Sequence, residues 1–305
     1  LEAAFAKELD PANAGPRLVT FDGDGTLYPD RCALDVGGRE GMGRAAEVDT
    51  FMDVTAKELM ALLVQLLQRG VSVALCTALG DPSPGPYEKR LRGLLRALAG
   101  KSLIAPGAAL YAVGGQCNYV FRYCEGSGCF VALERQAWEP DMMKEWGAAQ
   151  VTEVLDVAQQ ALVDGARRFG MEDETTLVRK ARAVGVHFTG AKRRSTAFFL
   201  DELALLARAA VQGVQAGRPC QLPFCTFNGG SDVFVDIGSK EIGIDVLRSL
   251  VGAERAETLH VGDQFTRTGN DLLARRACGT LWVDDPAETA VVLRELVSEM
   301  DARKS

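Results

Sequence analysis

The sequence predicts an α/β fold, in which a doubly wound, Rossmann-like parallel sheet carries an inserted α+β cap domain. Three observations support this prediction. Short apolar runs end in polar residues, helical stretches alternate with these runs, and the middle of the chain departs from the alternation. Strands that alternate with helices form parallel sheets with helices on both faces. The 305 residues suit one large domain or a core with one insertion.

The strands expected in the core are short runs of apolar and β-branched residues, which is typical of buried strands. Three of these runs are followed by the polar residues Asp22, Thr77 and Asp263. Because sites in such sheets lie at the carboxyl ends of the strands, these three side chains are candidates for one site. The expected core strands are residues 17–21, 71–76, 257–261 and 280–283.

The helices of the core are expected between these strands. Five leucines between residues 55 and 69 share one helical face, and Gly70 stops that helix. Residues 30–54 mix glycine with charge and are expected to form a loop. The proline-rich segment 80–86 fits neither a helix nor a central strand. The other expected helices are residues 87–98, 239–250 and 270–277, with a helical or frayed lead-in at residues 1–16.

Residues 101–225 break the alternation and are expected to form the cap, which leaves residues 1–100 and 226–305 for the core. Glycine pairs interrupt several short β-like runs in the first part of this segment. The expected elements are short strands within 103–135, one long helix at 141–170, a strand at 176–190, a helix at 199–216, and strands at 224–227 and 232–237.

Composition and charge narrow the classes of partner. The 34 basic and 41 acidic residues give a net charge of −7, which argues against a nucleic-acid partner and leaves a small-molecule substrate. No run reaches about 18 apolar residues, so no membrane span is expected. With no secretory leader visible and eight cysteines that form no CxxC pair, a cytoplasmic protein with reduced thiols and no zinc site is expected. A homo-oligomer remains open.

The strongest chemical signal is the pair Asp22 and Asp24, which leaves a strand and enters a glycine-rich loop. Two carboxylates this close repel each other and usually need a cation or a shared proton. Mg²⁺ suits them, because it binds carboxylates, water and substrate phosphate. An EF-hand loop is excluded by Leu27 and Ala33 at its sixth and twelfth positions, and a dinucleotide fingerprint by Tyr28 in place of its third glycine. A purely structural Asp-Gly turn is the remaining alternative.

Asp22-Gly-Asp24-Gly-Thr26 resembles the first motif of the haloacid dehalogenase superfamily of phosphohydrolases. The other motifs follow in order as Thr77 after a strand, Lys240 before a helix, and Gly262-Asp263 with a downstream Asn270-Asp271.

The resemblance implies a role for each matching residue. Asp22 would attack phosphorus, and Asp24 would protonate the leaving oxygen and then deprotonate water. Thr77 and Lys240 would hold phosphate oxygens. Mg²⁺ would be held by Asp22, the Asp24 carbonyl and Asp263.

Longer strings are similar to the IMP-specific 5′-nucleotidase family within this superfamily. The resemblance covers about residues 17 to 285 and implies hydrolysis of inosine monophosphate (IMP) to inosine and phosphate with Mg²⁺. The family pattern has glycine at Arg31 and tryptophan at Phe234, and a longer N-terminal region, which puts effector or oligomer contacts from that region in doubt. The strings are residues 87–91, 113–121, 224–240 and 260–271.

Residues that recognise the substrate follow less directly. Asp232 is the candidate for hydrogen bonds to the nucleoside and Phe234 for stacking on the base, although residues 232, 234 and 236 share one strand face that could simply be packed. Arg90 could reach the phosphate or lie exposed on its helix, and Asn118 could contact a purine edge. His187 and His260 are expected to be packing or hydrogen-bonded residues rather than catalysts.

Two other functions stay open. The first is a phosphomannomutase-like phosphotransferase, whose cap must bind a second phosphate through basic residues. The second is a non-catalytic nucleotide-binding protein, against which the complete set of motif residues argues. The basic candidates for a second phosphate are Arg179, Lys180, Arg182 and the run at residues 192–194.

Overall fold

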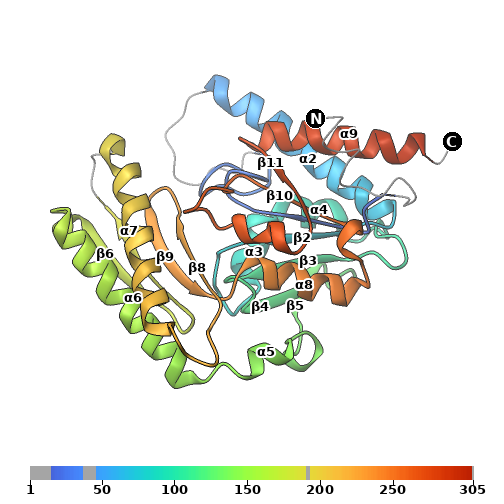
Figure 1. Ribbon diagram of the computed structural model, residues 1–305. Helices are drawn as coiled ribbons and strands as arrows, with labels where there is room; N and C mark the ends of the chain where they lie inside the picture. The colour runs from blue at the N-terminus through green and yellow to red at the C-terminus, as the bar shows by residue number, and fades with distance from the viewer. Residues whose placement is uncertain (1–14, 37–45, 190–192, 304–305) are drawn as a thin grey trace.

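The computed structural model describes residues 15–36, 46–189 and 193–303. Most of the predicted lead-in at residues 1–16, and the lysine of the 192–194 run, lie outside the described residues. The described chain forms a seven-stranded sheet and a four-stranded sheet, each with helices packed on it (Figure 1). Among the described helices, none has both the length and the apolar character that a membrane span requires.

The larger sheet carries the polar strand ends that the sequence singles out. Its strands are β1 (Leu18–Phe21), β2 (Ser72–Cys76), β3 (Leu110–Gly114), β4 (Tyr119–Cys124), β5 (Cys129–Ala132), β10 (Thr258–Gly262) and β11 (Gly279–Trp282). The order is β11-β10-β1-β2-β3-β4-β5, and the first five of these strands run parallel. Phe21 is in register with Leu75 on β2 and with Val261 on β10. The loops that follow β1, β2 and β10 therefore leave the sheet at the same edge.

Helices cover both faces of this sheet. On one face lie α2 (Ala46–Gln68), α3 (Gly85–Arg90), α4 (Arg92–Leu98) and α9 (Pro286–Ala302). The leucines of α2 are buried against this face, and Gly70 ends the helix with φ +87°, as predicted. The other face carries α8 (Lys240–Val251) and the short 3-10 helix η4 (Leu272–Arg276). The doubly wound α/β fold is confirmed.

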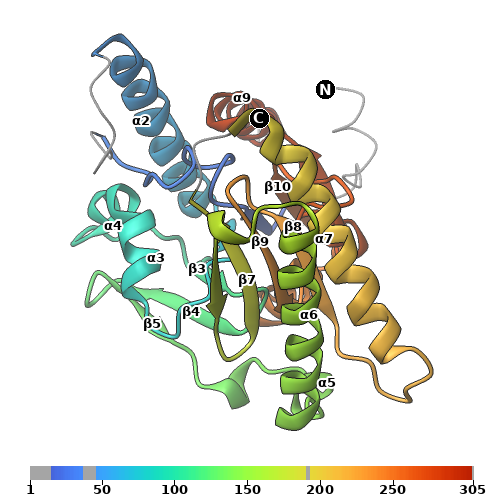
Figure 2. The ribbon, with the colours of Figure 1, turned by 90° about the vertical axis from the view of Figure 1, so that its left-hand side faces the viewer.

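The smaller sheet is antiparallel, in the order β6-β7-β9-β8. Its strands are β6 (Thr175–Arg179), β7 (Ala183–Phe188), β8 (Phe224–Asn228) and β9 (Asp232–Ile237). Two long helices, α6 (Ala148–Arg168) and α7 (Arg193–Gln215), pack on each other and on this sheet. Figures 1 and 2 show them on the outer side of the sheet, away from the larger sheet.

The strand pairing differs from the predicted boundaries at residues 101 and 226. Strands β3, β4 and β5 were expected in the cap, but β3 pairs with β2 and extends the larger sheet. Strand β9 was expected in the core, but it pairs with β7 and β8. The cause is that alternation along the chain identifies a strand without identifying its neighbour, which is set by contacts distant in sequence.

Several predicted elements also differ in extent. The expected helix at 141–170 is divided into two helices, α5 (Asp141–Lys144) and α6. The division arises because Gly147, the N-cap residue of α6, has an extended backbone conformation. The expected strand at 176–190 is the hairpin β6–β7. Helix α2 begins at Ala46, inside the predicted loop, whereas the helix predicted at 87–98 is divided at Leu91. The helix expected at 270–277 is the 3-10 helix η4, and α9 was not predicted.

Candidate active site

Three carboxylates gather at the polar edge of the larger sheet. Asp22 follows β1, Asp263 follows β10, and Asp271 precedes η4. One oxygen from each of the three lies within 4.8 Å of the others. Asp22 and Asp271 are buried, with 6% and 0% of their surfaces exposed. Like charges at this spacing and burial are unfavourable without a compensating cation.

Lys240 supplies part of that compensation. Its Nζ lies 2.9 Å from Asp22 Oδ1 and 2.5 Å from Asp271 Oδ1, and it donates to Asn270 Oδ1 at 3.2 Å. The residue stands at the start of α8, whose N-cap Ser239 accepts a hydrogen bond from Ile242 N, and only 2% of it is exposed. Burial alone would lower the pKa of Lys240, but the two carboxylates outweigh burial and raise it. The ammonium therefore stays charged beside Asp22.

Asp271 is a site residue to which the sequence analysis gave no role, although it stands in the quoted motif. Burial alone would raise its pKa, but Lys240 and His260 lower it, so the carboxylate is ionised. His260 Nε2 lies 2.8 Å from Asp271 Oδ1, and the other ring nitrogen lies 2.8 Å from Thr20 Oγ1. A Cβ at Gly262 would lie 2.5 Å from the Asp271 carboxyl, so only glycine fits beneath it. The signal in the sequence was an acid directly after Asn270 and nine residues beyond Gly262.

Asp24 lies on the same loop as Asp22 but outside the group of three acids. Its Oδ1 accepts a hydrogen bond from Arg31 N at 2.7 Å and lies 3.5 Å from Arg90 Nη1. Burial raises the pKa of Asp24, while Arg90 and the Arg31 N–H oppose that rise. Arg31 has φ +61°, a left-handed conformation that glycine adopts without strain, which is consistent with the glycine of the family pattern. Its guanidinium donates to Ser231 Oγ on the turn between β8 and β9.

Arg90 therefore lies beside the Asp24 carboxylate rather than exposed on its helix. From this position we predict a change in the pH dependence of turnover when Arg90 is replaced. If protonated Asp24 is required for turnover, activity falls as the pH rises through the pKa of Asp24. Arg90 lowers that pKa, so Arg90→Met is expected to move the alkaline limb of kcat to higher pH. The measurement is the pH profile of phosphate release. An unchanged limb together with a raised KM would instead assign Arg90 to the phosphate.

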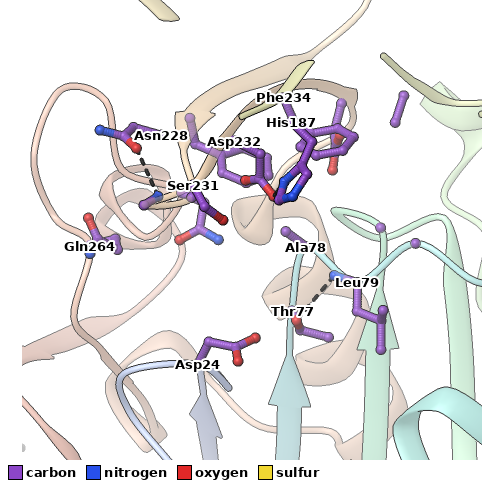
Figure 3. Close-up of a pocket in the computed structure, with 18 of the residues that line it drawn as sticks. Asp24, Thr77, Ala78, Leu79, His187, Asn228, Ser231, Asp232, Phe234 and Gln264 are labelled. Atoms are coloured by element: carbon purple, nitrogen blue, oxygen red, sulfur yellow. Dashed lines mark hydrogen bonds and ion pairs between the residues drawn. The ribbon is translucent and has the colours of Figure 1, made fainter. Parts of the chain in front are cut away.

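Thr77 follows β2 and lines the same cavity as Asp22 and Asp24. Its Oγ1 accepts a hydrogen bond from Leu79 N at 3.1 Å, so its O–H is oriented by the loop (Figure 3). Tyr87 Oη holds that loop by donating to Leu79 O at 2.7 Å. The hydroxyl can act as a donor at the carboxyl edge of the sheet.

A cavity of about 1010 Å³ separates this edge from the smaller sheet. Its far wall includes His187, Asp232 and Phe234, which project opposite Asp24 and Thr77 (Figure 3). The Phe234 ring is stacked on Phe227 with centroids 6.2 Å apart. The predicted common face of residues 232, 234 and 236 is observed, since all three line the cavity. An aromatic ring and acids thus face the carboxylate cluster across a space large enough for a nucleotide.

The remaining candidates stand in different surroundings. Asn118 lines the cavity. Its Nδ2 donates to Gly115 O and Ile237 O at 2.5 and 2.6 Å and so ties the two sheets together, while its Oδ1 is buried without a hydrogen-bond partner. Of the basic residues considered for a second phosphate, Lys180 and Arg182 line the cavity, whereas Arg179 pairs with Asp156 at 2.7 Å. His187 Nδ1 lies 3.8 Å from Asp232 Oδ2.

The acidic cluster fits a divalent cation. Burial raises the pKa of Asp22, and Asp263 and Asp271 raise it further, against the effect of Lys240. Burial likewise raises the pKa of Asp263, and Asp271 adds to that rise. Lys240 thus leaves negative charge uncompensated between Asp22 and Asp263. Carboxylate oxygens at this spacing are the ligands that Mg²⁺ prefers.

A family model described as IMP-specific 5′-nucleotidase matches residues 48–293. The chain is 36% identical over 301 residues to IMP-specific 5′-nucleotidase 1 of Candida glabrata, covering 93% of this chain and 63% of the relative. It is 34% identical to the Neurospora crassa protein of the same name, covering 95% of this chain and 65% of that one. The chain therefore spans somewhat less than two thirds of the length of these relatives.

Solved structures show the same similarity in three dimensions. An N-terminally truncated, IMP-bound IMP-nucleotidase of Plasmodium falciparum superposes with a TM-score of 0.76 at 25% identity, covering 93% of this chain and 68% of that one. An ATP-bound structure of the Plasmodium falciparum IMP-nucleotidase gives a TM-score of 0.74 at 26% identity, covering 96% of this chain and 63% of that one.

Proposed function

Because this chain belongs to the IMP-specific 5′-nucleotidase family, we propose that it hydrolyses inosine monophosphate to inosine and phosphate, with Mg²⁺ as cofactor. The observation that carries the proposal is the joint position of Asp22, Asp263 and Lys240 at one edge of a sheet, beneath a cavity of nucleotide size. The smaller sheet with its helices would act as the cap. The mutase alternative gains no support from the relatives, and Arg179 has a partner outside the cavity.

The proposed reaction has two steps. An Asp22 carboxylate oxygen attacks phosphorus, the bond from phosphorus to the 5′-oxygen breaks, and Asp24 protonates that oxygen as inosine leaves. Asp24 then takes a proton from water, which attacks the phosphoryl group on Asp22 and releases phosphate. The ionised Lys240 lies 2.9 Å from Asp22, where it can neutralise phosphate oxygens, and the Thr77 hydroxyl can donate to them.

Asp22 and Asp263 would hold Mg²⁺, with Asp271 beside them. That the backbone carbonyl of Asp24 is a further Mg²⁺ ligand remains a prediction. The bound cation would lessen the repulsion between the Asp22 carboxylate and the substrate phosphate. Asp271 is tied to Lys240 and His260, so its part is to hold the ammonium in place.

A phosphate-release screen tests this proposal. The substrates are IMP, GMP, AMP, CMP, ribose 5-phosphate and a hexose phosphate, each with Mg²⁺ and with a chelator. We expect IMP to give the highest kcat/KM, and chelation to lower its turnover by at least about 10²-fold because the charge on the acids is then uncompensated. Isomerisation of the hexose phosphate without phosphate release would favour the mutase, and nucleotide binding without turnover in Mg²⁺ would favour a binding protein.

A further inference from the structure

Asp236 is a buried acid on the cavity wall to which no role has been assigned so far. It stands on β9, two residues beyond Phe234 on the same face, and lines the cavity with only 3% of its surface exposed. Its Oδ1 is buried and has no hydrogen-bond partner. By contrast, Asp232 on the same face is half-buried and lies 3.8 Å from His187. A buried carboxyl without a partner is costly, so its position calls for a ligand that supplies one.

One cation, Lys180, stands near this acid on the turn between β6 and β7. Lys180 Nζ lies 5.6 Å from the centroid of the Phe234 ring, whereas the Arg182 guanidinium lies over the Trp146 ring, 5.6 Å from its centroid, with Nη1 buried and without a hydrogen-bond partner. Lys180 and Arg182 both line the cavity. Burial raises the pKa of Asp236 to about 7, with Lys180 opposing the rise and Asp232 adding to it. An arriving N–H donor would favour the ionised carboxylate.

We propose that Asp236 determines base specificity by accepting a hydrogen bond from the ring N–H of a lactam base, while Lys180 donates to the carbonyl oxygen of that base. The inference rests on the proposed nucleotidase function. Hypoxanthine presents a ring N–H next to a carbonyl oxygen, whereas adenine presents a ring nitrogen lone pair next to an amino group. A carboxylate beside a cation therefore matches hypoxanthine and repels adenine.

The position of Phe234 supports this assignment. Residues two apart on a strand are separated by about 6.6 Å, so a purine stacked on Phe234 lies within reach of Asp236. A Cβ at Gly185 would lie 2.5 Å from the Phe234 ring, so the ring rests directly on the neighbouring strand and its position is fixed. The flexible stem of Lys180 lets its ammonium leave the ring face when a base enters.

Asp236→Asn tests the inference, because the amide has the same shape and can present a donor as well as an acceptor. The readout is kcat/KM for IMP, AMP and ribose 5-phosphate, with Asp245→Asn as the control that removes one negative charge from the exposed side of α8, outside the cavity. We expect the IMP-to-AMP ratio to fall at least about tenfold in Asp236→Asn, with a much smaller change for ribose 5-phosphate, and to stay near wild type in Asp245→Asn.

The possible outcomes separate this inference from the proposed function. A wild-type preference for IMP that survives in Asp236→Asn would overturn the inference and leave the nucleotidase proposal standing. A wild-type protein whose kcat/KM for ribose 5-phosphate equals its kcat/KM for IMP would overturn the nucleotidase proposal itself. Thermal unfolding checks that Asp236→Asn folds. If it does not, Lys180→Met must lower the same ratio, and an unchanged ratio there contradicts the inference.

Discussion

Replacing Asp22 with asparagine is expected to abolish phosphate release from IMP while leaving the protein folded. The amide nitrogen and oxygen keep the shape of the carboxylate but provide no anionic nucleophile, so kcat is expected to fall by at least about 10³-fold. Gly23 N donates to Asp22 Oδ1 at 2.7 Å, a bond that the asparagine oxygen can keep. Phosphate release and the thermal unfolding temperature are measured on the same preparation.

Asp245→Asn is the matched control for that substitution. Asp245 lies on the outer side of α8 and pairs with Arg248 at 2.8 Å. The same chemical change there is expected to leave kcat near wild type. Turnover in Asp22→Asn close to that of the control would show that another group attacks phosphorus.

The second large effect is expected on stability, from Lys240→Met. Removing the ammonium leaves Asp22 and Asp271 buried without their cation, and breaking a buried pair in this way typically costs about 3–5 kcal/mol of unfolding free energy. Urea denaturation at neutral pH with a chelator present measures the cost. Lys144→Met, whose partner Asp141 is exposed, is expected to leave the urea midpoint unchanged.

The pH dependence of this effect has a definite sign. Lys240 and His260 lower the pKa of Asp271 in the folded protein, so the stabilisation is present above the unfolded pKa and is lost as the pH falls through the folded value. The difference between wild type and Lys240→Met should therefore be largest near neutral pH and shrink at strongly acidic pH. A difference that does not change with pH would mean that Lys240 contributes mainly through packing.

The residues that follow parallel strands were predictable, because strand composition and the topology of such sheets determine where they lie. Asp22, Thr77 and Asp263 come together for this reason, and the helix start at Lys240 brings its ammonium to the same edge. Strands β3 to β5 were expected in the cap but belong to the larger sheet. Their short runs fit either sheet until the pairing of β3 with β2 is known.

Other site residues could not be found from sequence patterns. Asp271 owes its role to Lys240 and His260, which lie 31 and 11 residues away in the chain. The turn that carries Lys180 and Arg182 was not predicted, because residues 176–190 were expected to form a single strand. Asp236 was noted only as part of a strand face, because burial and the lack of a partner are properties of the folded structure.

Trapping the phosphorylated protein tests the central claim most directly. Turnover of IMP in Mg²⁺ is stopped within the first catalytic cycles, the chain is digested, and the peptides are examined by mass spectrometry. We predict one added phosphoryl group on Asp22, absent from Asp22→Asn. Phosphate release with no phosphorylated peptide, or with the group on another residue, would contradict a mechanism in which Asp22 is the nucleophile.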